Sequence, residues 1–200
     1  MNLDQLIDTL RSLPEPAIER VKGYVEYLRT EQVTSDEVLE EQFWSLIELV
    51  QVGWEEEMED FAPLTDRLAE QGEKAIYAFE EQLARKLSAL DGPAYFKHAG
   101  KNGSADSFLY ARCSVVLTGR KTYEDILVHP DNFPKTLWWN EELLYCAATA
   151  FKQRFGKEMV FMASVIYESF YNEEQWGKGT VLKRLGISAK DVEEKAKAWQ

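Results

Sequence analysis

Residues 91–119 read DGPAYFKHAGKNGSADSFLYARCSVVLTG, and the rest of the chain is organised around them. Asp91-Gly92-Pro93 is a turn signal, and residues 93–99 have room for one or two helical turns. After a loop at residues 100–103, Ser104-Ala105-Asp106 supplies an N-cap for a helix that runs to the end of the stretch. Its apolar residues cover it nearly all round, as expected for the central helix of a bundle; they are Phe108, Leu109, Cys113, Val116 and Leu117.

The clearest helix in the sequence comes directly before this stretch, over residues 73–90. Its apolar residues recur at the spacing of one helix face; they are Ile76, Phe79, Leu83, Leu87 and Leu90. Pro63 restarts the chain ahead of it, and a short helix over residues 64–71 ends at Gly72. The sequence therefore predicts two consecutive helices that lead into the turn at residue 91.

The first part of the chain predicts further helices. Ser12-Leu13-Pro14-Glu15 has the form of a capping box that opens a helix over residues 14–31, and a shorter helix over residues 2–11 precedes it. Together they form a predicted helical hairpin over residues 1–32. A second capping box, at residues 34–37, opens another helix. The inner face of that helix holds Leu39, Phe43, Leu46, Ile47 and Val50.

The last part of the chain continues the helical pattern. Asn140 can cap a helix that Gly156 closes. Residues 158–171 predict another helix, although their β-branched and aromatic composition is also typical of a strand. A capped final helix is predicted over residues 188–199. We therefore expect an all-α fold, in which a helical bundle domain over residues 35–200 carries the N-terminal hairpin.

Charge is distributed unevenly along the chain. The net charge is −12, and residues 1–60 alone contain 16 acidic and 4 basic residues, which accounts for the whole excess. Residues 85–121 contain 7 basic residues against Asp91 and Asp106. An acidic chain repels phosphate, so nucleic acid is an unfavourable partner. The acidic N-terminal region instead suits a basic partner protein.

The two cysteines, Cys113 and Cys146, both lie in apolar helical patterns, so we expect reduced core thiols rather than a disulfide framework. The N-terminal residues lack the basic and apolar regions of a signal peptide. No run approaches the ~18 apolar residues of a membrane span. The expectation is a cytoplasmic protein with no membrane association, no metal and no cofactor.

Polar residues of the central stretch are candidates for binding a ligand or a small anion; they are Lys97, His98, Lys101, Asn102, Ser104, Asp106, Arg112 and Arg120. Backbone N–H groups and a serine at a helix N-terminus suit an anion. The alternative is structural: Ser104 and Asp106 cap a helix, and Arg120 pairs with Glu124 at i, i+4. No spacing typical of a metal site, a phosphate loop or a catalytic triad occurs around His98, and the catalytic residues stay unknown.

Candidates for binding a partner protein lie on both sides of that stretch; they are Glu55, Glu56, Glu57, Glu59, Asp60, Trp138 and Trp139. The acidic cluster could also be a solvated helix face, and the two tryptophans could fill the core. Val21, Val25 and Leu28 could mediate a homodimer through the N-terminal hairpin, or could pack on the bundle.

Four strings in the chain resemble one bacterial family: FWSLI at 43–47, GPAYFKHAG at 92–100, SADSFLYARCSVVLTGRKTYEDILVHPD at 104–131 and EELLYCAATAF at 141–151. This is the domain-of-unknown-function family numbered 4240, and the resemblance covers about residues 40–155. The family's serine–aspartate–aspartate–glycine–phenylalanine turn corresponds to Ser104-Ala105-Asp106-Ser107-Phe108, where Ala105 replaces the first aspartate. The resemblance implies a mainly helical bacterial domain and no assigned activity.

The N-terminal string LPEPAIERVKGYVEYLR, within about residues 1–32, also resembles a short helical element of a bacterial antitoxin-associated family. With the charge asymmetry and the lack of a catalytic pattern, it predicts a non-enzymatic interaction protein of antitoxin, immunity or regulatory-adaptor type. The alternative is an enzyme or small-anion-binding protein that uses the polar surface of residues 97–121. Convergence of those side chains on one pocket would favour the alternative.

Overall fold

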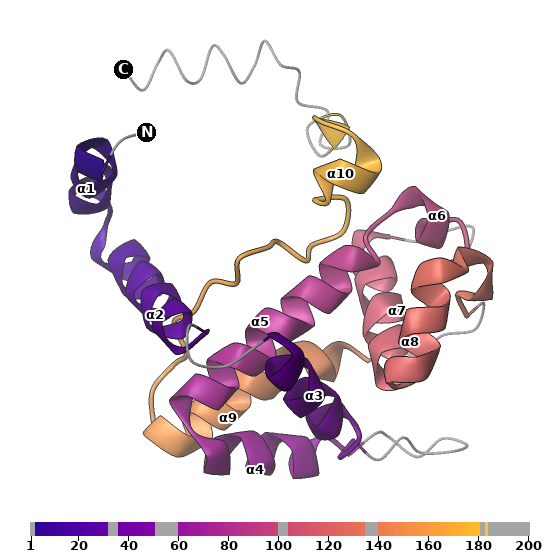
Figure 1. Ribbon diagram of the computed structural model, residues 1–200, viewed down its shortest axis with the longest axis horizontal. Helices are drawn as coiled ribbons and strands as arrows, with labels where there is room; N and C mark the ends of the chain where they lie inside the picture. Colours follow the sequence, from indigo (N-terminus) through magenta and orange to yellow (C-terminus); the bar gives the residue numbers. More distant parts are fainter. Residues whose placement is uncertain are drawn as a thin grey trace. The chain divides into compact units, whose positions relative to one another are not determined.

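The computed structural model describes residues 3–31, 36–50, 60–99, 104–134, 140–180 and 183. These residues form helices and irregular segments and no β-strand, which confirms the all-α expectation (Figure 1). The α-helices are α1 (Leu3–Ser12), α2 (Glu15–Glu31), α3 (Asp36–Ile47), α4 (Ala62–Gln71), α5 (Glu73–Ala89), α6 (Pro93–Phe96), α7 (Ala105–Leu117), α8 (Arg120–Val128), α9 (Cys146–Phe155) and α10 (Glu173–Trp176). Two 3-10 helices are η1 (Pro130–Asn132) and η2 (Glu141–Tyr145).

The chain forms two compact units, and each unit is built from two separate stretches of sequence. Unit 1 consists of residues 1–84 and 141–165, and unit 2 consists of residues 85–140 and 166–200. Helix α5 begins in unit 1 and ends in unit 2.

In unit 1, α4 packs along α9, and α3 packs against α4 (Figure 1). Phe43 of α3 contacts Phe79 of α5, with ring centroids 5.3 Å apart. Apolar side chains from these helices form the core; the largest fully buried ones are Phe43, Leu64, Leu68, Ile76, Phe79, Leu83 and Phe151. This set includes Ile76, Phe79 and Leu83 from the face predicted for the helix over residues 73–90.

In unit 2, α7 packs against α8, and α6 packs against η1. Residues all around α7 are buried, as predicted for a central helix. Tyr123 of α8 donates a hydrogen bond from Oη to the carbonyl of Lys86, at 3.0 Å. The Oη of Tyr95 in α6 donates to the carbonyl of Leu127, at 3.3 Å.

Several helix ends lie where the sequence predicts them. The Oγ of Ser104 accepts a hydrogen bond from the Ser107 amide at 3.0 Å, so Ser104 is the N-cap of α7. Gly156 adopts φ +68° and ends α9 in the left-handed region that favours glycine. Cys113 and Cys146 are both buried and free, as expected.

The helix predicted over residues 158–171 is wrong. Residues 158–167 are irregular, and only α10 follows before residue 177. A competing interaction explains the difference: the buried carboxylate of Glu81 accepts hydrogen bonds from the amide and the hydroxyl of Ser164. The β-branched and aromatic residues of the segment also lose side-chain freedom in a helix.

Other expectations concern residues outside those described. The final helix over residues 188–199 lies outside them, as does the domain boundary at residues 32–35. Helices α1 and α2 have the predicted spans, whereas their arrangement as a hairpin stays a prediction. Among the described residues, no helix is both long enough and apolar enough to cross a membrane.

Candidate functional site

The predicted polar residues of unit 2 do not converge on one pocket. Lys97 and His98, just after α6, both lie near the exposed carboxylate of Asp131 in η1. The Nζ of Lys97 is 2.9 Å from its Oδ1, and the Nε2 of His98 is 3.3 Å from the same oxygen. The hydrogen bond and positive charge of Lys97 are the main causes that lower the pKa of Asp131. Lys97 therefore already pairs with an anion, and His98 lies against the same carboxylate.

Ser104, Asp106 and Arg120 stabilise helix ends or form ion pairs, which is the structural role that the sequence offered as the alternative to ligand binding. Ser104 caps α7, and Asp106 lies exposed in the first turn of that helix, where its negative charge interacts favourably with the positive end of the helix dipole. Arg120 begins α8, and its Nε donates to the Oε1 of Glu124 at 2.7 Å. Each side chain thus serves its own helix terminus or ion pair.

Arg112 lies in the interior of unit 2 and not on a polar surface. Its side chain is 0% exposed. Nη1 donates to the carbonyl of Leu87 at 2.8 Å, and Nη2 donates to the Oγ of Ser169 at 2.8 Å. The guanidinium also lies over the ring of Phe108, 4.8 Å from its centroid. Burial lowers the pKa of Arg112 to about 10, against the opposing effect of the negative charge of Asp91.

Asp91 is a buried polar residue that the sequence analysis assigned only to a turn. Its carboxylate is 0% exposed and accepts three hydrogen bonds. The donors are the Phe170 amide at 2.8 Å, the Asn172 amide at 2.9 Å and the Trp176 indole Nε1 at 2.9 Å. An acidic residue directly after an apolar helix that ends in a turn was the available sequence signal.

The remaining sequence candidates are mostly outside the described residues; those outside are Lys101, Asn102, Glu55, Glu56, Glu57, Glu59, Trp138 and Trp139. Asp60 is exposed, and its Oδ1 accepts a hydrogen bond from the Ala62 amide at 2.9 Å, at the start of α4. Within the described part of the chain, no group of three or more His, Cys, Asp or Glu residues is arranged to hold a metal ion.

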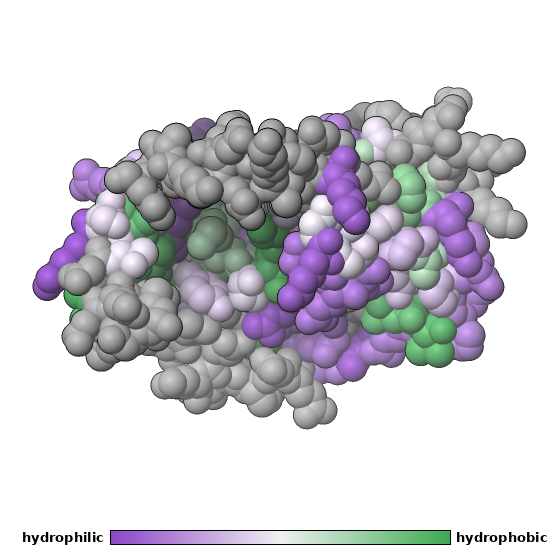
Figure 2. Space-filling model, turned by 90° about the horizontal axis from the view of Figure 1, so that it is seen from above, coloured by the Kyte–Doolittle hydropathy of each residue, from purple (hydrophilic) through white to green (hydrophobic). Residues whose placement is uncertain are grey.

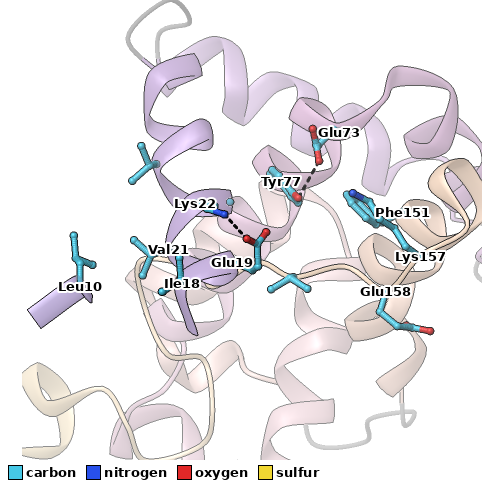
Figure 3. Close-up of a pocket in the computed structure, with 13 residues that line it drawn as sticks. Leu10, Ile18, Glu19, Val21, Lys22, Glu73, Tyr77, Phe151, Lys157 and Glu158 are labelled. Carbon is cyan, nitrogen blue, oxygen red and sulfur yellow. Dashed lines mark hydrogen bonds and ion pairs between the residues drawn. The ribbon is translucent and has the colours of Figure 1, made fainter. Parts of the chain in front are cut away.

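A hollow of about 660 Å³ lies within unit 1, between α2 and the α5 and α9 helices. Figure 3 shows Ile18 and Val21 of α2 on one side of it, with Tyr77 of α5 and Phe151 of α9 on the other. Leu10, Val25 and Val160 complete its apolar lining, and charged residues surround it. Val25 is 41% exposed. Sequence periodicity predicts the apolar face of α2, but it does not predict that Tyr77 and Phe151 lie opposite that face.

The aromatic floor of this hollow is a stack of three rings. Tyr77 lies parallel to Phe161, with centroids 4.8 Å apart, and to Phe151, with centroids 5.7 Å apart. Its Oη donates to Glu73 at 3.1 Å, and burial, followed by the charge of Glu73, raises the pKa of Tyr77. The Nζ of Lys157 lies 5.6 Å from the centroid of Phe151. The floor is therefore aromatic, with charged groups at its border.

The backbone of α2 passes close to the irregular segment after α9 at Gly23. A Cβ atom at this position would lie 2.8 Å from the carbonyl oxygen of Val160, which is closer than van der Waals contact allows. Glycine is therefore required where the helix backbone meets the irregular segment after α9. Beside this contact, Lys22 and Glu19 of α2 form an ion pair (Figure 3).

The two units carry very different charges. Unit 1 contains 24 Asp and Glu against 9 Lys and Arg, a net charge of −15, whereas unit 2 contains 11 against 14, a net charge of +3. Figure 2 shows one face of the molecule, on which hydrophilic residues cover much of the coloured surface. The charge asymmetry seen along the sequence therefore coincides with a structural division.

Residues 39–153 match the family described as "Protein of unknown function (DUF4240)". The chain belongs to this family. The matched residues begin in α3 and end in α9, which confirms the resemblance recognised over residues 40–155. Neither a comparison with curated proteins nor one with solved structures found a match.

The DUF4240 region contains only part of the buried Asp91 and Arg112 cluster and only part of the hollow in unit 1. Asp91 and Arg112 lie inside it, whereas their partners Ser169 and Phe170 lie beyond its end. In unit 1, the Tyr77 and Phe151 floor lies inside the region, and α2 lies before it. Both features are therefore completed by residues outside the matched family segment.

Proposed function

We propose that this chain is a non-enzymatic bacterial interaction protein of antitoxin, immunity or regulatory-adaptor type, acting in the cytoplasm. Its acidic N-terminal region, residues 1–60, binds a basic partner protein. The observation that carries the proposal is the net charge of −15 on unit 1 against +3 on unit 2. Such a field accelerates the encounter with a basic protein and orients it toward unit 1.

The arrangement of the polar residues of unit 2 supports the proposal from the other direction. An enzyme or anion-binding site needs side chains that converge on a shared space. Here Lys97 pairs with Asp131, Arg120 pairs with Glu124, and Arg112 is buried. These described candidates do not offer a common pocket to a small anion, so the interaction function is the better supported of the two.

The test uses the full-length chain in three forms. The first is the wild-type protein, and the second replaces Glu55, Glu56, Glu57 and Glu59 with glutamine. The third is a matched control that removes four carboxylates elsewhere, by E174Q, D191N, E193Q and E194Q. Each immobilised form is exposed to bacterial lysate at about 50 mM and about 500 mM salt, because salt screens exposed charges over ~10 Å near 0.1 M.

The expected result is a basic protein retained at low salt by the wild type and the control, and released by high salt or by the first set of substitutions. Retention that is equal for both substituted forms, or that survives high salt unchanged, would contradict the proposal. So would the absence of any basic protein from the low-salt eluate.

A further inference from the structure

The carboxyl end of α5 presents several hydrogen-bond acceptors that the helix itself leaves unsatisfied. The last carbonyl groups of any α-helix have no partner within the helix. In α5 the carbonyls of Leu87 and Ser88 each accept one hydrogen bond from an amide of the following turn. Side chains from distant segments donate as well: to Leu87 from Arg112 at 2.8 Å, to Ser88 from the Nδ2 of Asn172 at 2.8 Å, and to Ala89 from the Nε2 of Gln175 at 2.7 Å. Two of these three donors come from residues 172–175.

The carboxylate of Asp91 adds a charged acceptor directly after the same helix. All three side-chain hydrogen bonds that it accepts come from residues 170–176, two of them from main-chain amides. A buried carboxylate is costly without such donors, and hydrogen bonds to a charge are the stronger kind. The end of α5 therefore recognises the backbone of the chain that lies on it.

Arg112 supplies the cationic counterpart from α7. Its Nη2 donates to the Oγ of Ser169, and that hydroxyl donates in turn to the carbonyl of Ala105 at 2.6 Å. The Nε of Arg112 is buried and has no hydrogen-bond partner among the described residues. Arg112 thus holds Ser169 while keeping a further donor unused.

Two aromatic side chains of the same segment anchor it in an aromatic setting. Phe170 meets the ring of Phe96 edge to face, with centroids 5.3 Å apart, and stacks on Phe108 at 6.2 Å. Trp176 lies 5.8 Å from Phe96 and 5.1 Å from Phe170. Phe170 is buried and Trp176 is half-buried, and aromatic anchors of this kind dominate the affinity of peptide and protein interfaces.

Gly92 allows the side chain of Gln175 to approach the backbone closely. A Cβ at this position would lie 1.8 Å from the Oε1 of Gln175 and 2.7 Å from its Cδ, so a larger residue would displace the side chain. The residues that contact this segment, from Leu87 to Arg112, lie inside the matched family region, whereas residues 169–176 lie outside it.

We propose that Asp91, Arg112, Phe96, Phe108 and the carboxyl end of α5 form a peptide-binding site, and that residues 169–176 are its internal ligand. The ligand class is a short turn-forming peptide with two aromatic side chains six residues apart. Its main-chain amides bind Asp91, and a hydroxyl binds Arg112. A partner segment with these features replaces the internal one.

The outer side of the internal ligand fits this assignment. Tyr171 is 42% exposed, and Glu173 and Glu174 are exposed, so the contacts with the site come from the other residues. Phe170 adopts φ +78°, a backbone conformation that is strained for a residue other than glycine. The internal ligand is therefore held by specific contacts in spite of local strain, and an external peptide that makes the same contacts competes with it.

The probe is a fluorescently labelled synthetic peptide with the sequence of residues 166–180, IYESFYNEEQWGKGT. It is added to the full-length wild type and to a full-length F170A/W176A variant, whose own segment has lost both anchors. Binding is measured by fluorescence anisotropy. We expect the variant to bind the peptide at least about tenfold more tightly than the wild type, in which the site is occupied.

Two controls define specific binding. Adding D91N to the variant abolishes binding of the probe, and a peptide in which Phe170 and Trp176 are both alanine does not bind. Equal binding to the wild type and the variant overturns the proposal. So does a folded variant that binds no peptide.

Hydrogen exchange on the wild-type chain tests the same proposal if the variant fails to fold. The amides of Phe170 and Asn172 are expected to exchange by local opening, faster than the amides of Val115 and Val116 in α7. Exchange of all four amides at one common rate would show that the segment leaves only when unit 2 unfolds, and would overturn the proposal. Neither readout depends on the acidic residues 55–60, so each proposal stands or fails by itself.

Discussion

Replacing Asp91 with asparagine is the sharpest test of how unit 2 is held together. An asparagine can keep one oxygen, which in the wild type accepts from the Phe170 amide and from Trp176 Nε1. Its NH₂ group then faces the Asn172 amide, which bonds to the other carboxylate oxygen at 2.9 Å. Two donors now oppose each other, and one charge-assisted hydrogen bond is lost.

The expected magnitude follows from these contacts. A hydrogen bond to a charged group contributes about 1.5–3 kcal/mol, and converting the other two to neutral bonds costs about 1 kcal/mol more. We therefore expect Asp91→Asn to lower the free energy of unfolding by about 3 kcal/mol, a large share of the ~5–15 kcal/mol typical of a domain. For a chain of this size the melting temperature should fall by roughly 6–12 °C.

Urea unfolding monitored by tryptophan fluorescence and by circular dichroism measures this loss. Asp106→Asn is the matched control, because Asp106 is exposed at the start of α7 and contributes at most about 1 kcal/mol through the helix dipole. A loss below about 1 kcal/mol for Asp91→Asn would refute the reasoning. It would mean that water replaces the three donors at little cost.

Three further predictions concern unit 1. Gly23→Ala should destabilise the chain by about 1–3 kcal/mol, although alanine favours a helix, because its Cβ would meet the carbonyl of Val160; thermal unfolding and the protease sensitivity of α2 measure this. Burial, with a smaller effect of Glu81, raises the pKa of Glu80 to about 7. The native state then binds more protons than the unfolded state between about pH 4.5 and 7, so stability falls as pH rises through this window, by up to about 3 kcal/mol. Glu80→Gln should remove this pH dependence, and an unchanged slope would count against it. Burial raises the pKa of Cys146 to about 12, so a thiol reagent at pH 8 should modify it only after unfolding.

Local signals in the sequence were sufficient for most helices. The apolar period over residues 73–90 corresponds to α5, and Ser104, Gly72 and Gly156 mark helix ends because hydrogen bonding and backbone conformation at those positions depend on neighbouring residues. These features could be predicted without knowing which helices meet.

The errors lie where distant residues decide the structure. The segment after Gly156 has an apolar composition that suits a helix or a strand. It forms neither, because the carboxylate of Glu81, more than eighty residues earlier, accepts the hydrogen bond of the Ser164 amide. Arg112 was grouped with surface cations because of its charge. Its neighbours in α7 are apolar on every side, and this pattern was the available indication that the guanidinium is buried.

The candidate site was predictable only in part. The apolar face of α2 follows from its helical period, and the charge excess of residues 1–60 follows from counting. The stacked rings of Tyr77, Phe151 and Phe161 come from three separate segments, so their meeting depends on tertiary packing. The same holds for the three donors on Asp91.

The carboxyl end of α5 also constrains when the protein can fold during its synthesis. Asn172, which bonds to Asp91, follows it by 81 residues. At roughly 5–20 residues per second, the ribosome adds this partner about 4–16 s after Asp91 itself. Both units contain a stretch that begins after residue 140, so neither can be completed on a shorter nascent chain. Truncated products of translation would therefore expose a carboxylate without its three donors and carbonyls without their side-chain partners, and we expect such fragments to depend on chaperones.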